Sequence, residues 1–434
     1  MIKSHKMDKI AELIKKEEKR QKTTLQMIPS ENFASKEVRK AIGSVLMNKY
    51  SEGYPHKRYY QGNEYIDQIE KLAIEEAKKL FEVPYANVQP YSGSPANAEV
   101  YFALLEAGDT IMGMDLSSGG HLTHGHPKIT FSGKYFKSVQ YSVKTDGSLD
   151  YDKIRKIALE NKPKIIISGL TSYPGILDFK KFGKIAGEVG AYHLADISHI
   201  AGLVVGGVYP SPFEHAHIIM TTTHKTLRGP RGAVILVTNK GLEKDPELPS
   251  KIDKAVFPGM QGGPHNNTTA GILVCFQEAQ TKEFKKYAQQ IVSNAETLSQ
   301  ELIKLGYKLV TNGTKNHLIL IDLSNKNIDG WFAAWALEYA GIIVNRNTIP
   351  YDEKNPFYPS GIRLGTPAIT TMGMKQKEMT IIATLIDRAI KTAVKNLPQE
   401  INKETRKNFK NILAKNKEIS KIKKEVESLC KNFN

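Results

Sequence analysis

One lysine stands where it could react as a free amine rather than as a surface charge. Lys225 lies in the run TTTHKT (221–226), after an apolar stretch expected to be a strand and before a Gly-Pro-Arg-Gly turn. Burial at such a place lowers the pKa of a lysine, and the resulting free amine can form an imine with a carbonyl group. A single strand-end lysine more often pairs with a carboxylate, so its neighbours must decide between the two interpretations.

An acidic residue ends another apolar run, AYHLADISHIAG (191–202). A carboxylate at this position, Asp196, can keep the pyridine nitrogen of pyridoxal phosphate protonated, which makes the ring an electron sink. His199, three residues later, can support the ring or its phenolic oxygen. The alternatives are helix capping by Asp196 and a packed histidine at position 199. Together with Lys225, Asp196 favours a pyridoxal-phosphate site.

A short polar turn precedes an expected helix and can bind an anion. Ser92, Gly93 and Ser94 stand directly before the helix expected over Pro95–Glu106. Two hydroxyls, a glycine and a helix N-terminus form a cradle suited to a phosphate. The same residues also make an ordinary helix cap, and taken alone they indicate both equally.

Three histidines follow two glycines in SSGGHLTHGH (117–126). The flat imidazole of His121 could stack on the cofactor ring. His121, His124 and His126 could instead hold a metal ion, but no acidic or cysteine residue stands among them, so we expect no metal. A serine hydrolase has little support, because the chain has no G-x-S-x-G turn.

A late arginine completes the set of groups that an amino-acid substrate needs. Arg363 lies in SGIRLGTPA (360–368), where glycines and a proline indicate a shaped loop. Its guanidinium can bind a carboxylate through two parallel hydrogen bonds. The alternative is a surface ion pair.

The elements that position these residues alternate between short apolar runs and helical patterns. This alternation predicts a mostly parallel sheet covered by helices, with ligands beyond the carboxyl ends of the strands. The expected strands are Thr110–Met114, Lys164–Ser168, Tyr192–Asp196, Ile218–Thr222 and Val234–Val237. The expected helices are Pro95–Glu106, Tyr151–Asn161 and Lys180–Val189.

The pattern changes after about residue 276, where we expect a smaller α+β part. One long helix is expected over Phe276–Leu305, then a strand over His317–Leu323, and amphipathic helix near the C-terminus. We expect three parts: a helical and irregular arm at a dimer interface (1–78), a large α/β domain (79–278) and a small C-terminal domain with a lysine-rich helical end (279–434).

Composition limits the remaining classes of function. The net charge is +16, but ten of these charges lie in residues 1–22 and 401–434, where they suit solvated helix faces, so nucleic acid is not an expected partner. No long apolar run or secretory signal is present, which predicts no membrane association. The two cysteines, Cys275 and Cys430, give no disulfide framework, and we expect a reducing, cytoplasmic setting.

The separate motifs together resemble one known family. TTTHKTLRGPRG resembles the cofactor-lysine motif of the serine hydroxymethyltransferases. Other blocks are similar to that family in the same order, from about residue 8 to about residue 390: IPSENFAS, NKYSEGYPHKRYYQGNEYID, VQPYSGSPAN, DTIMGMDLSSGGHLTHG, FPGMQGGPH, NRNTIP and SGIRLGTPA.

The resemblance implies a fold-type I pyridoxal-phosphate enzyme. It implies the reversible conversion of L-serine and tetrahydrofolate into glycine and 5,10-methylenetetrahydrofolate, with pyridoxal 5'-phosphate as cofactor. It also implies a site shared between subunits and hence a homodimer, with further pairing into a tetramer left open.

The resemblance further implies a role for each matching residue. The expected catalytic residues are Lys225, Glu52, His121, Asp196 and Thr222, with Glu52 moving protons near the serine hydroxyl. The expected cofactor-binding residues are Lys225, Ser92, Gly93, Ser94, His121, Thr171, Asp196, His199, Thr222 and His224, with Tyr50, Gly262 and Gly263 from a neighbouring subunit. The expected substrate-binding residues are Ser30, Glu52, Tyr60 and Arg363 for serine, and Leu116, Gly120, Leu122 and Asn347 for folate.

The sequence departs from the family pattern at two places, and two other functions compete. Thr171 replaces a common serine, and Ser118 replaces a common histidine. A threonine aldolase would share Lys225, Asp196 and Arg363 but would not depend on tetrahydrofolate. A basic RNA-binding protein would lose salt-sensitive retention of RNA when residues 401–434 are deleted.

Overall fold

The computed structural model describes residues 4–433, and contacts divide the chain into two units. One unit is Asn32–Val292, and the other joins the residues up to Glu31 with those from Ser293 onward. The boundary falls within one helix, α12 (Lys282–Lys304). The three-part division expected from the sequence remains a proposal. Its arm (1–78) is defined by a dimer interface, whereas these two units are defined by contacts within one chain.

The unit Asn32–Val292 contains a seven-stranded sheet in the order β4-β10-β9-β8-β7-β5-β6. The five strands from β9 to β6 run parallel, while β10 is antiparallel to both of its neighbours. The predicted mostly parallel α/β class is therefore confirmed. The strands are β4 (Tyr85–Asn87), β5 (Thr110–Met114), β6 (Lys137–Tyr141), β7 (Ile165–Gly169), β8 (Tyr192–Asp196), β9 (Ile218–Thr222) and β10 (Ala233–Val237).

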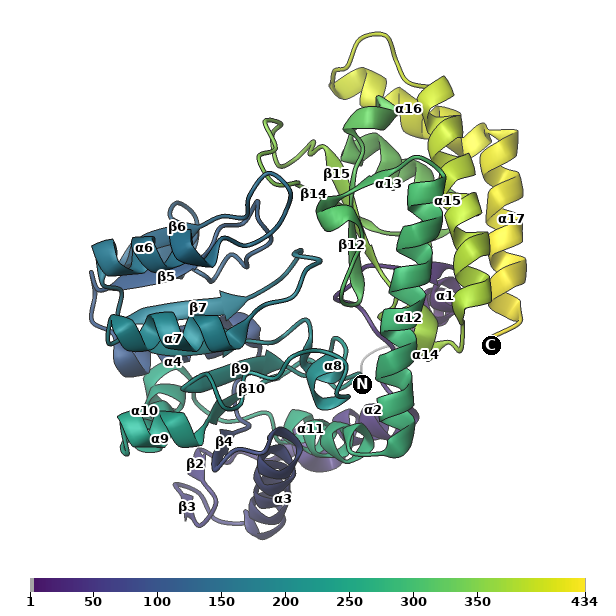
Figure 1. Ribbon diagram of the computed structural model, residues 1–434. Helices are drawn as coiled ribbons and strands as arrows, with labels where there is room; N and C mark the ends of the chain where they lie inside the picture. The colour runs from purple at the N-terminus through teal and green to yellow at the C-terminus, as the bar shows by residue number, and fades with distance from the viewer. Residues whose placement is uncertain (1–3, 434) are drawn as a thin grey trace. The chain divides into compact units, whose positions relative to one another are not determined.

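Helices cover both faces of this sheet (Figure 1). On one face, Val100 and Tyr101 of α4 pack with Ile165, Leu194 and strand residues beside them in a buried apolar cluster. On the other face, Phe182 of α7 lies against the rings of Tyr141 and His193. Successive residues of a strand point to opposite faces, so Leu194 and His193 serve different layers. This burial on both faces explains why the strands read as continuous apolar runs.

The helices of this unit begin at side chains suited to capping. Asp150 and Asp178 accept hydrogen bonds from the backbone N–H groups of Lys153 and Lys181, both at 3.0 Å, and so start α6 and α7. The elements are α2 (Lys36–Ile42), η1 (Val45–Asn48), α3 (Glu64–Phe81), α4 (Gly93–Leu104), α5 (Phe131–Tyr135), α6 (Tyr151–Asn161), α7 (Phe179–Glu188), α8 (Ala201–Val205), α9 (Asn239–Lys244), α10 (Leu248–Lys254), η2 (Ala255–Met260) and α11 (Asn266–Ala279), with the hairpin β2 (Gly53–Tyr54) and β3 (Lys57–Arg58).

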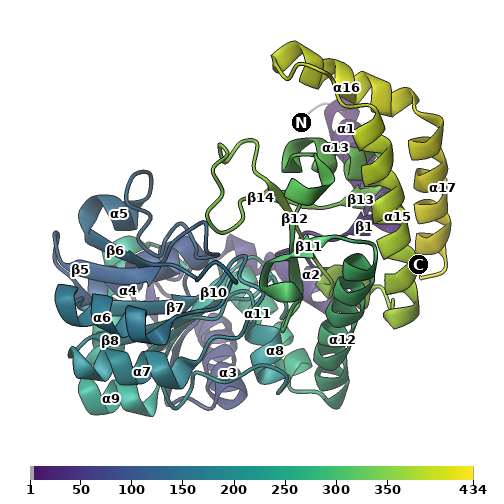
Figure 2. The same ribbon diagram turned by 45° about the horizontal axis from the view of Figure 1, so that its top comes forward.

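The second unit has its own sheet, in the order β11-β12-β15-β14, and a separate two-stranded pairing of β1 with β13. Its strands appear beside α12, α13 and α15 in Figure 2. Its elements are α1 (Ser4–Thr23), β1 (Leu25–Gln26), β11 (Lys308–Leu309), η3 (Val310–Asn312), β12 (Leu318–Asp322), η4 (Ser324–Lys326), α13 (Gly330–Tyr339), β13 (Ile342–Ile343), β14 (Asn345–Asn347), β15 (Gly361–Gly365), α14 (Pro367–Thr371), α15 (Gln376–Lys395), α16 (Lys403–Lys415) and α17 (Lys417–Lys431).

The lysine-rich end is helical, with its apolar side buried as its spacing predicts. Phe409 and Leu413 of α16 and Ile422 and Val426 of α17 belong to the same core as β12 and β15. Arg388 of α15 also holds α17 through the carboxylates of Glu418 and Glu425, both at 2.7 Å. The lysines of this end therefore belong to the polar side of amphipathic helices. Among residues 4–433, no helix has both the length and the apolar content needed to cross a bilayer.

The single long helix predicted over Phe276–Leu305 is wrong. The structure has two helices there, α11 ending at Ala279 and α12 beginning at Lys282. The hydroxyl of Thr281 accepts a hydrogen bond from Phe284 N at 3.2 Å. A threonine in this position caps a new helix, because it satisfies a backbone donor that has no partner inside the helix.

Candidate active site

Functional side chains gather at the carboxyl ends of neighbouring parallel strands. Gly169 ends β7, Asp196 ends β8 and Thr222 ends β9, and Gly169 and Asp196 are direct neighbours in the ladder. This is the edge of an open α/β sheet where ligands bind. The strand ends predicted from the sequence therefore meet at one place.

Asp196 is buried and held by three donors. Its Oδ2 lies 2.9 Å from His124 Nε2 and 3.0 Å from Asn97 Nδ2, and its Oδ1 accepts from Ser198 N at 3.0 Å. Burial alone would raise the pKa of Asp196, but the hydrogen bond and charge of His124 hold that pKa well below its usual value. The Asp196 carboxylate therefore stays negatively charged at this edge of the sheet.

Gly169 makes this arrangement possible. A Cβ at position 169 would lie 2.7 Å from His124 Cε1 and 2.9 Å from Asp196 Cβ. Any side chain there would push apart the pair that keeps Asp196 ionised, so glycine is required for packing.

Lys225 follows β9 and faces back toward it. Its Nζ donates to Thr222 Oγ1 at 2.7 Å, and Thr222 N donates to Ser198 Oγ at 3.2 Å. The backbone of the loop that carries Lys225 is also held, because Asn32 Nδ2 donates to Lys225 O at 2.9 Å. Ser198 thus connects the surroundings of Lys225 with Asp196.

The polar segment Ser92–Ser94 lies against Thr222, and Gly93 and Ser94 form the first residues of α4, two residues earlier than the start predicted at Pro95. A Cβ on Gly93 would come within 2.7 Å of Thr222 Cγ2, so only glycine allows this approach. Ser92 occupies the N-cap position of α4, yet its side chain makes no capping hydrogen bond, and Ser94 is exposed. The start of a twelve-residue helix therefore keeps its donors for an anion. A lysine amine, a buried carboxylate and this cradle fit the three polar parts of pyridoxal phosphate.

Four further residues that were predicted to bind the cofactor lie on loops of the same unit. His121 Nδ1 lies 2.7 Å from Thr123 Oγ1, and Thr171 N donates to Gly119 O at 2.7 Å. His199 is buried, and its carbonyl accepts from Thr226 Oγ1 at 3.1 Å. His224 Nε2 lies 3.3 Å from Arg231 Nη1, and burial lowers the pKa of His224 to about 3.

Gly120 and Leu122, two of the expected folate residues, flank His121 in the sequence. Leu122 is exposed, and a third expected folate residue, Leu116, is half-buried. A Cβ on Gly120 would lie only 2.0 Å from Met114 O, so this position admits no side chain.

A second group of predicted residues surrounds a glycine pair in the same unit. Tyr60 Oη donates to Glu52 Oε2 at 3.2 Å, and the rings of Tyr50 and Tyr60 meet edge to face at 5.5 Å. A Cβ on Gly262 would lie 3.2 Å from Glu52 Oε1, and one on Gly263 would lie 3.1 Å from the Tyr50 ring. The structure thus brings these five residues together.

Three predicted substrate residues lie in the other unit. Arg363 is buried on β15, its Nε donates to Asn345 Oδ1 at 3.1 Å, and burial lowers its pKa to about 10. Asn347 belongs to β14, where it pairs with Gly361. Ser30 follows the segment whose Met27 O accepts from Gly365 N at 2.8 Å. An arginine of this pKa stays charged at neutral pH.

Four residues around Asp196 were not among the predicted site residues, although His124 was considered as a possible metal ligand. They share one property, namely a hydrogen bond to Asp196 or to one of its partners: Asn97, Thr123, His124 and Ser198. The only available signals were the His-x-x-His spacing of His121 and His124 and the position of Asn97 one turn into α4. His124 is directed at Asp196, which gives this histidine a hydrogen-bonding role.

An α/β fold with a lysine and an ionised aspartate at the carboxyl ends of its parallel strands defines a fold-type I pyridoxal-phosphate enzyme. A family model described as serine hydroxymethyltransferase matches residues 4–386. A serine hydroxymethyltransferase of Desulfotalea psychrophila is 53% identical over 424 residues, covering 98% of this chain and 93% of the relative. One of Acidothermus cellulolyticus is 56% identical over 386 residues, covering 89% and 88%. The chain belongs to the serine hydroxymethyltransferase family.

One buried carboxylic acid lies on α4, the helix that begins at Gly93. Glu99 of α4 is fully buried, and among residues 4–433 neither of its carboxylate oxygens has a hydrogen-bond partner. Burial raises the pKa of Glu99 to about 8. The unfolded chain ionises near the ordinary value of 4.5, so the folded state loses stability as pH rises from there to about 8.

Replacing Glu99 with glutamine should therefore stabilise the protein at alkaline pH. The expected gain in unfolding free energy relative to the wild type is on the order of a few kcal/mol at about pH 8.5 and much smaller at about pH 5, at up to about 1.4 kcal/mol per pH unit. Urea denaturation at both pH values measures it, with Glu75→Gln on the exposed side of α3 as control. A gain that is equal at both pH values would contradict a titrating Glu99.

Proposed function

We propose that this chain binds pyridoxal phosphate through Lys225, Asp196 and the turn Ser92–Ser94, and uses it to transfer the hydroxymethyl carbon of serine. As a serine hydroxymethyltransferase, the chain converts L-serine and tetrahydrofolate reversibly into glycine, 5,10-methylenetetrahydrofolate and water. One observation carries the site assignment. The Lys225 amine and Gly93 both lie against Thr222. Ser198 contacts both Thr222 and the Asp196 carboxylate.

The bound cofactor supplies a ring that withdraws electrons from the substrate Cα. Asp196, kept ionised by His124, holds a proton on the ring nitrogen. Ser92, Gly93 and Ser94 bind the phosphate with side-chain and backbone donors. Lys225 supplies the amine that holds the cofactor covalently, and Thr222 orients this amine. The other residues proposed to hold the cofactor would be His121, which would stack on the ring, together with Thr171, His199, His224, Tyr50, Gly262 and Gly263.

The substrate groups act on the two ends of serine. Arg363 binds the carboxylate through its guanidinium fork, and Ser30 and Tyr60 are the other residues proposed to place serine. Glu52 accepts the proton of the serine hydroxyl as the Cα–Cβ bond breaks, and donates a proton to the same oxygen as it leaves as water during transfer of the carbon to tetrahydrofolate. Folate held beside the released carbon makes the capture effectively intramolecular. The proposed border of the folate site is Leu116, Gly120, Leu122 and Asn347.

The assembly that this site requires is a homodimer. Tyr50, Tyr59 and Tyr60 are 57%, 71% and 44% exposed. Large aromatic side chains at this level of exposure beside Glu52 support a face that a second copy covers. Tyr50, Glu52, Gly262 and Gly263 of one copy would then complete the Lys225 site of its partner. We also propose a cytoplasmic location, in which the two buried cysteines, Cys275 and Cys430, stay as thiols.

Mixing two inactive variants tests the shared site. Lys225→Ala and Glu52→Gln each disable a different half, so a dimer containing one copy of each has one intact site. After subunit exchange of equal amounts, about a quarter of the wild-type glycine formation from serine should return. Omitting tetrahydrofolate should remove that activity. Activity no greater than that of the separate variants would mean that each site is built from one chain.

A further inference from the structure

The backbone around Glu52 is held by a buried arginine from the next strand. Arg58 lies on β3, opposite Gly53 of β2, and its side chain is only 4% exposed. One guanidinium nitrogen, Nη1, donates to both Ser51 O and Gly53 O at 2.8 Å. These carbonyls belong to the residues on either side of Glu52, so a single group fixes the Ser51–Glu52 peptide and, one residue further on, the Gly53–Tyr54 peptide.

The other nitrogens of Arg58 are anchored to helix α3. Arg58 Nε donates to Asp67 Oδ1 at 2.8 Å, and Nη2 donates to Glu70 Oε2 at 2.6 Å. Gln89 joins the network, with its Nε2 donating to Gly53 O at 3.0 Å and to Glu70 Oε1 at 2.7 Å. The helix thus fixes the guanidinium, and the guanidinium fixes the loop.

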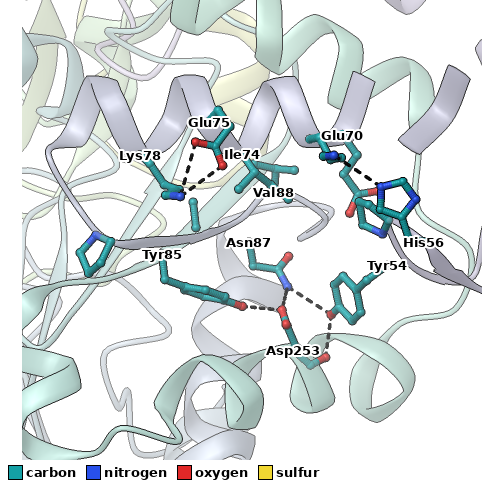
Figure 3. A pocket seen from close by; sticks show the side chains of 14 residues that line it. Tyr54, His56, Glu70, Ile74, Glu75, Lys78, Tyr85, Asn87, Val88 and Asp253 are labelled. Carbon is teal, nitrogen blue, oxygen red and sulfur yellow. Dashed lines mark hydrogen bonds and ion pairs between the residues drawn. The ribbon is translucent and has the colours of Figure 1, made fainter. Parts of the chain in front are cut away.

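Two further contacts restrict the same loop. Tyr59 N donates to Glu52 O at 3.1 Å, so the carbonyls of three successive residues accept from fixed donors. Tyr54, Asn87 and Asp253 line a pocket beside the hairpin, in which Tyr54 Oη donates to Asp253 O at 2.7 Å and accepts from Asn87 Nδ2 at 3.1 Å (Figure 3). The hairpin is therefore tied at both its base and its tip.

We propose that Arg58 is a positioning residue for Glu52, setting the place from which its carboxylate moves the proton of the serine hydroxyl. This inference rests on the proposed role of Glu52. Of the hydrogen bonds described, only the one from the Tyr60 hydroxyl reaches the Glu52 carboxylate. The position of this carboxylate therefore depends on the backbone of its loop. A lysine at position 58 keeps the charge but cannot supply the four hydrogen bonds of the fork.

A double-mutant cycle with Glu52→Gln and Arg58→Lys tests the inference. Arg58→Lys should lower kcat for transfer from serine to tetrahydrofolate by about 10- to 100-fold, since a displacement near 1 Å can cost that much. KM for serine and the visible absorbance of the bound cofactor should change little. In the double variant the rate should be no lower than in Glu52→Gln alone, because the residue that Arg58 positions is already lost.

The pH dependence of kcat supplies a second readout. The limb that Glu52→Gln removes should shift in Arg58→Lys, which a purely structural role would not cause. Arg388→Lys is the matched control, because it weakens a multidentate arginine pair in the other unit. Its kcat and pH profile should stay at wild-type values.

A milder variant keeps the test decisive should Arg58→Lys fold poorly. Gln89→Met removes one donor to Gly53 O, leaves both ion pairs of Arg58, and eliminates a buried amide oxygen that has no partner among residues 4–433. It should lower kcat severalfold in the wild type and not at all in Glu52→Gln. Multiplicative losses in either double variant would overturn the positioning role. A wild-type rate for Glu52→Gln alone would instead overturn the role of Glu52, and this inference with it.

Discussion

Changing Lys225 to alanine should lower glycine formation from serine by about a thousandfold or more, the scale expected when a nucleophilic and acid–base group is lost together. The visible absorbance of cofactor bound through the lysine should also disappear. The reason is geometric: the Lys225 amine donates to Thr222, which lies against Gly93 at the start of α4.

Two controls separate this role from a structural one. Lys240→Ala removes another lysine of the same unit, whose Nζ donates to His215 O at 3.3 Å, and it should leave both rate and absorbance unchanged. Absorbance and dialysis should show that Lys225→Ala still takes up pyridoxal phosphate, now reversibly, because Asp196 and the Ser92–Ser94 turn remain. Serine turnover at the wild-type level in Lys225→Ala would rule out the assigned role.

Changing Arg363 to alanine should weaken serine binding by about 100-fold, as expected for loss of a charge-assisted, two-point contact with a carboxylate. Cofactor affinity should change far less. Arg363→Lys should recover only part of the binding, because an ammonium group keeps the charge without the fork. Titrating serine and pyridoxal phosphate separately, with absorbance as the signal, measures both affinities.

A control is needed because Arg363 is also a packed residue. It is 7% exposed on a central strand, where removing its side chain also removes packing contacts. Arg346→Ala, on the neighbouring strand β14, is the control for a general loss of order there. An equal loss of serine and cofactor binding in Arg363→Ala would make the arginine structural and would falsify its role in the substrate site.

The strands were predictable because their chemistry is local. Runs such as Thr110–Met114, Tyr192–Asp196 and Ile218–Thr222 are bounded by turn residues and match the observed β5, β8 and β9. Since ligands of such sheets bind beyond the strand ends, the place of Asp196 and Lys225 followed from the same reasoning. The family resemblance then supplied the reaction.

The hydrogen-bond networks around Asp196 and Arg58 could not be predicted, because they depend on contacts between residues that are distant in the sequence. Asp196 is bonded to Asn97 and His124, which lie 99 and 72 residues away along the chain. Arg58 reads as one more positive charge in a tyrosine-rich loop, yet the structure buries it between two carboxylates. No periodicity encodes either arrangement, because each depends on how a loop meets a helix.

The break between α11 and α12 was missed for a different reason. Apolar residues continue at helical spacing across it, so periodicity alone favours one helix. Thr281 is a local signal for a new start, but a threonine inside a helix is common enough to be overlooked.

The pairing of β1 with β13 has a consequence for how the chain matures on the ribosome. Leu25 and Gln26 align with Ile342 and Ile343, so an early strand waits for a partner synthesised about 300 residues later. At about 5–20 residues per second, that delay is roughly 15–60 s, during which all of Asn32–Val292 has emerged and can fold first. The N-terminal segment is then an unpaired edge in the nascent chain, and it is the part most exposed to chaperones and proteases before synthesis ends.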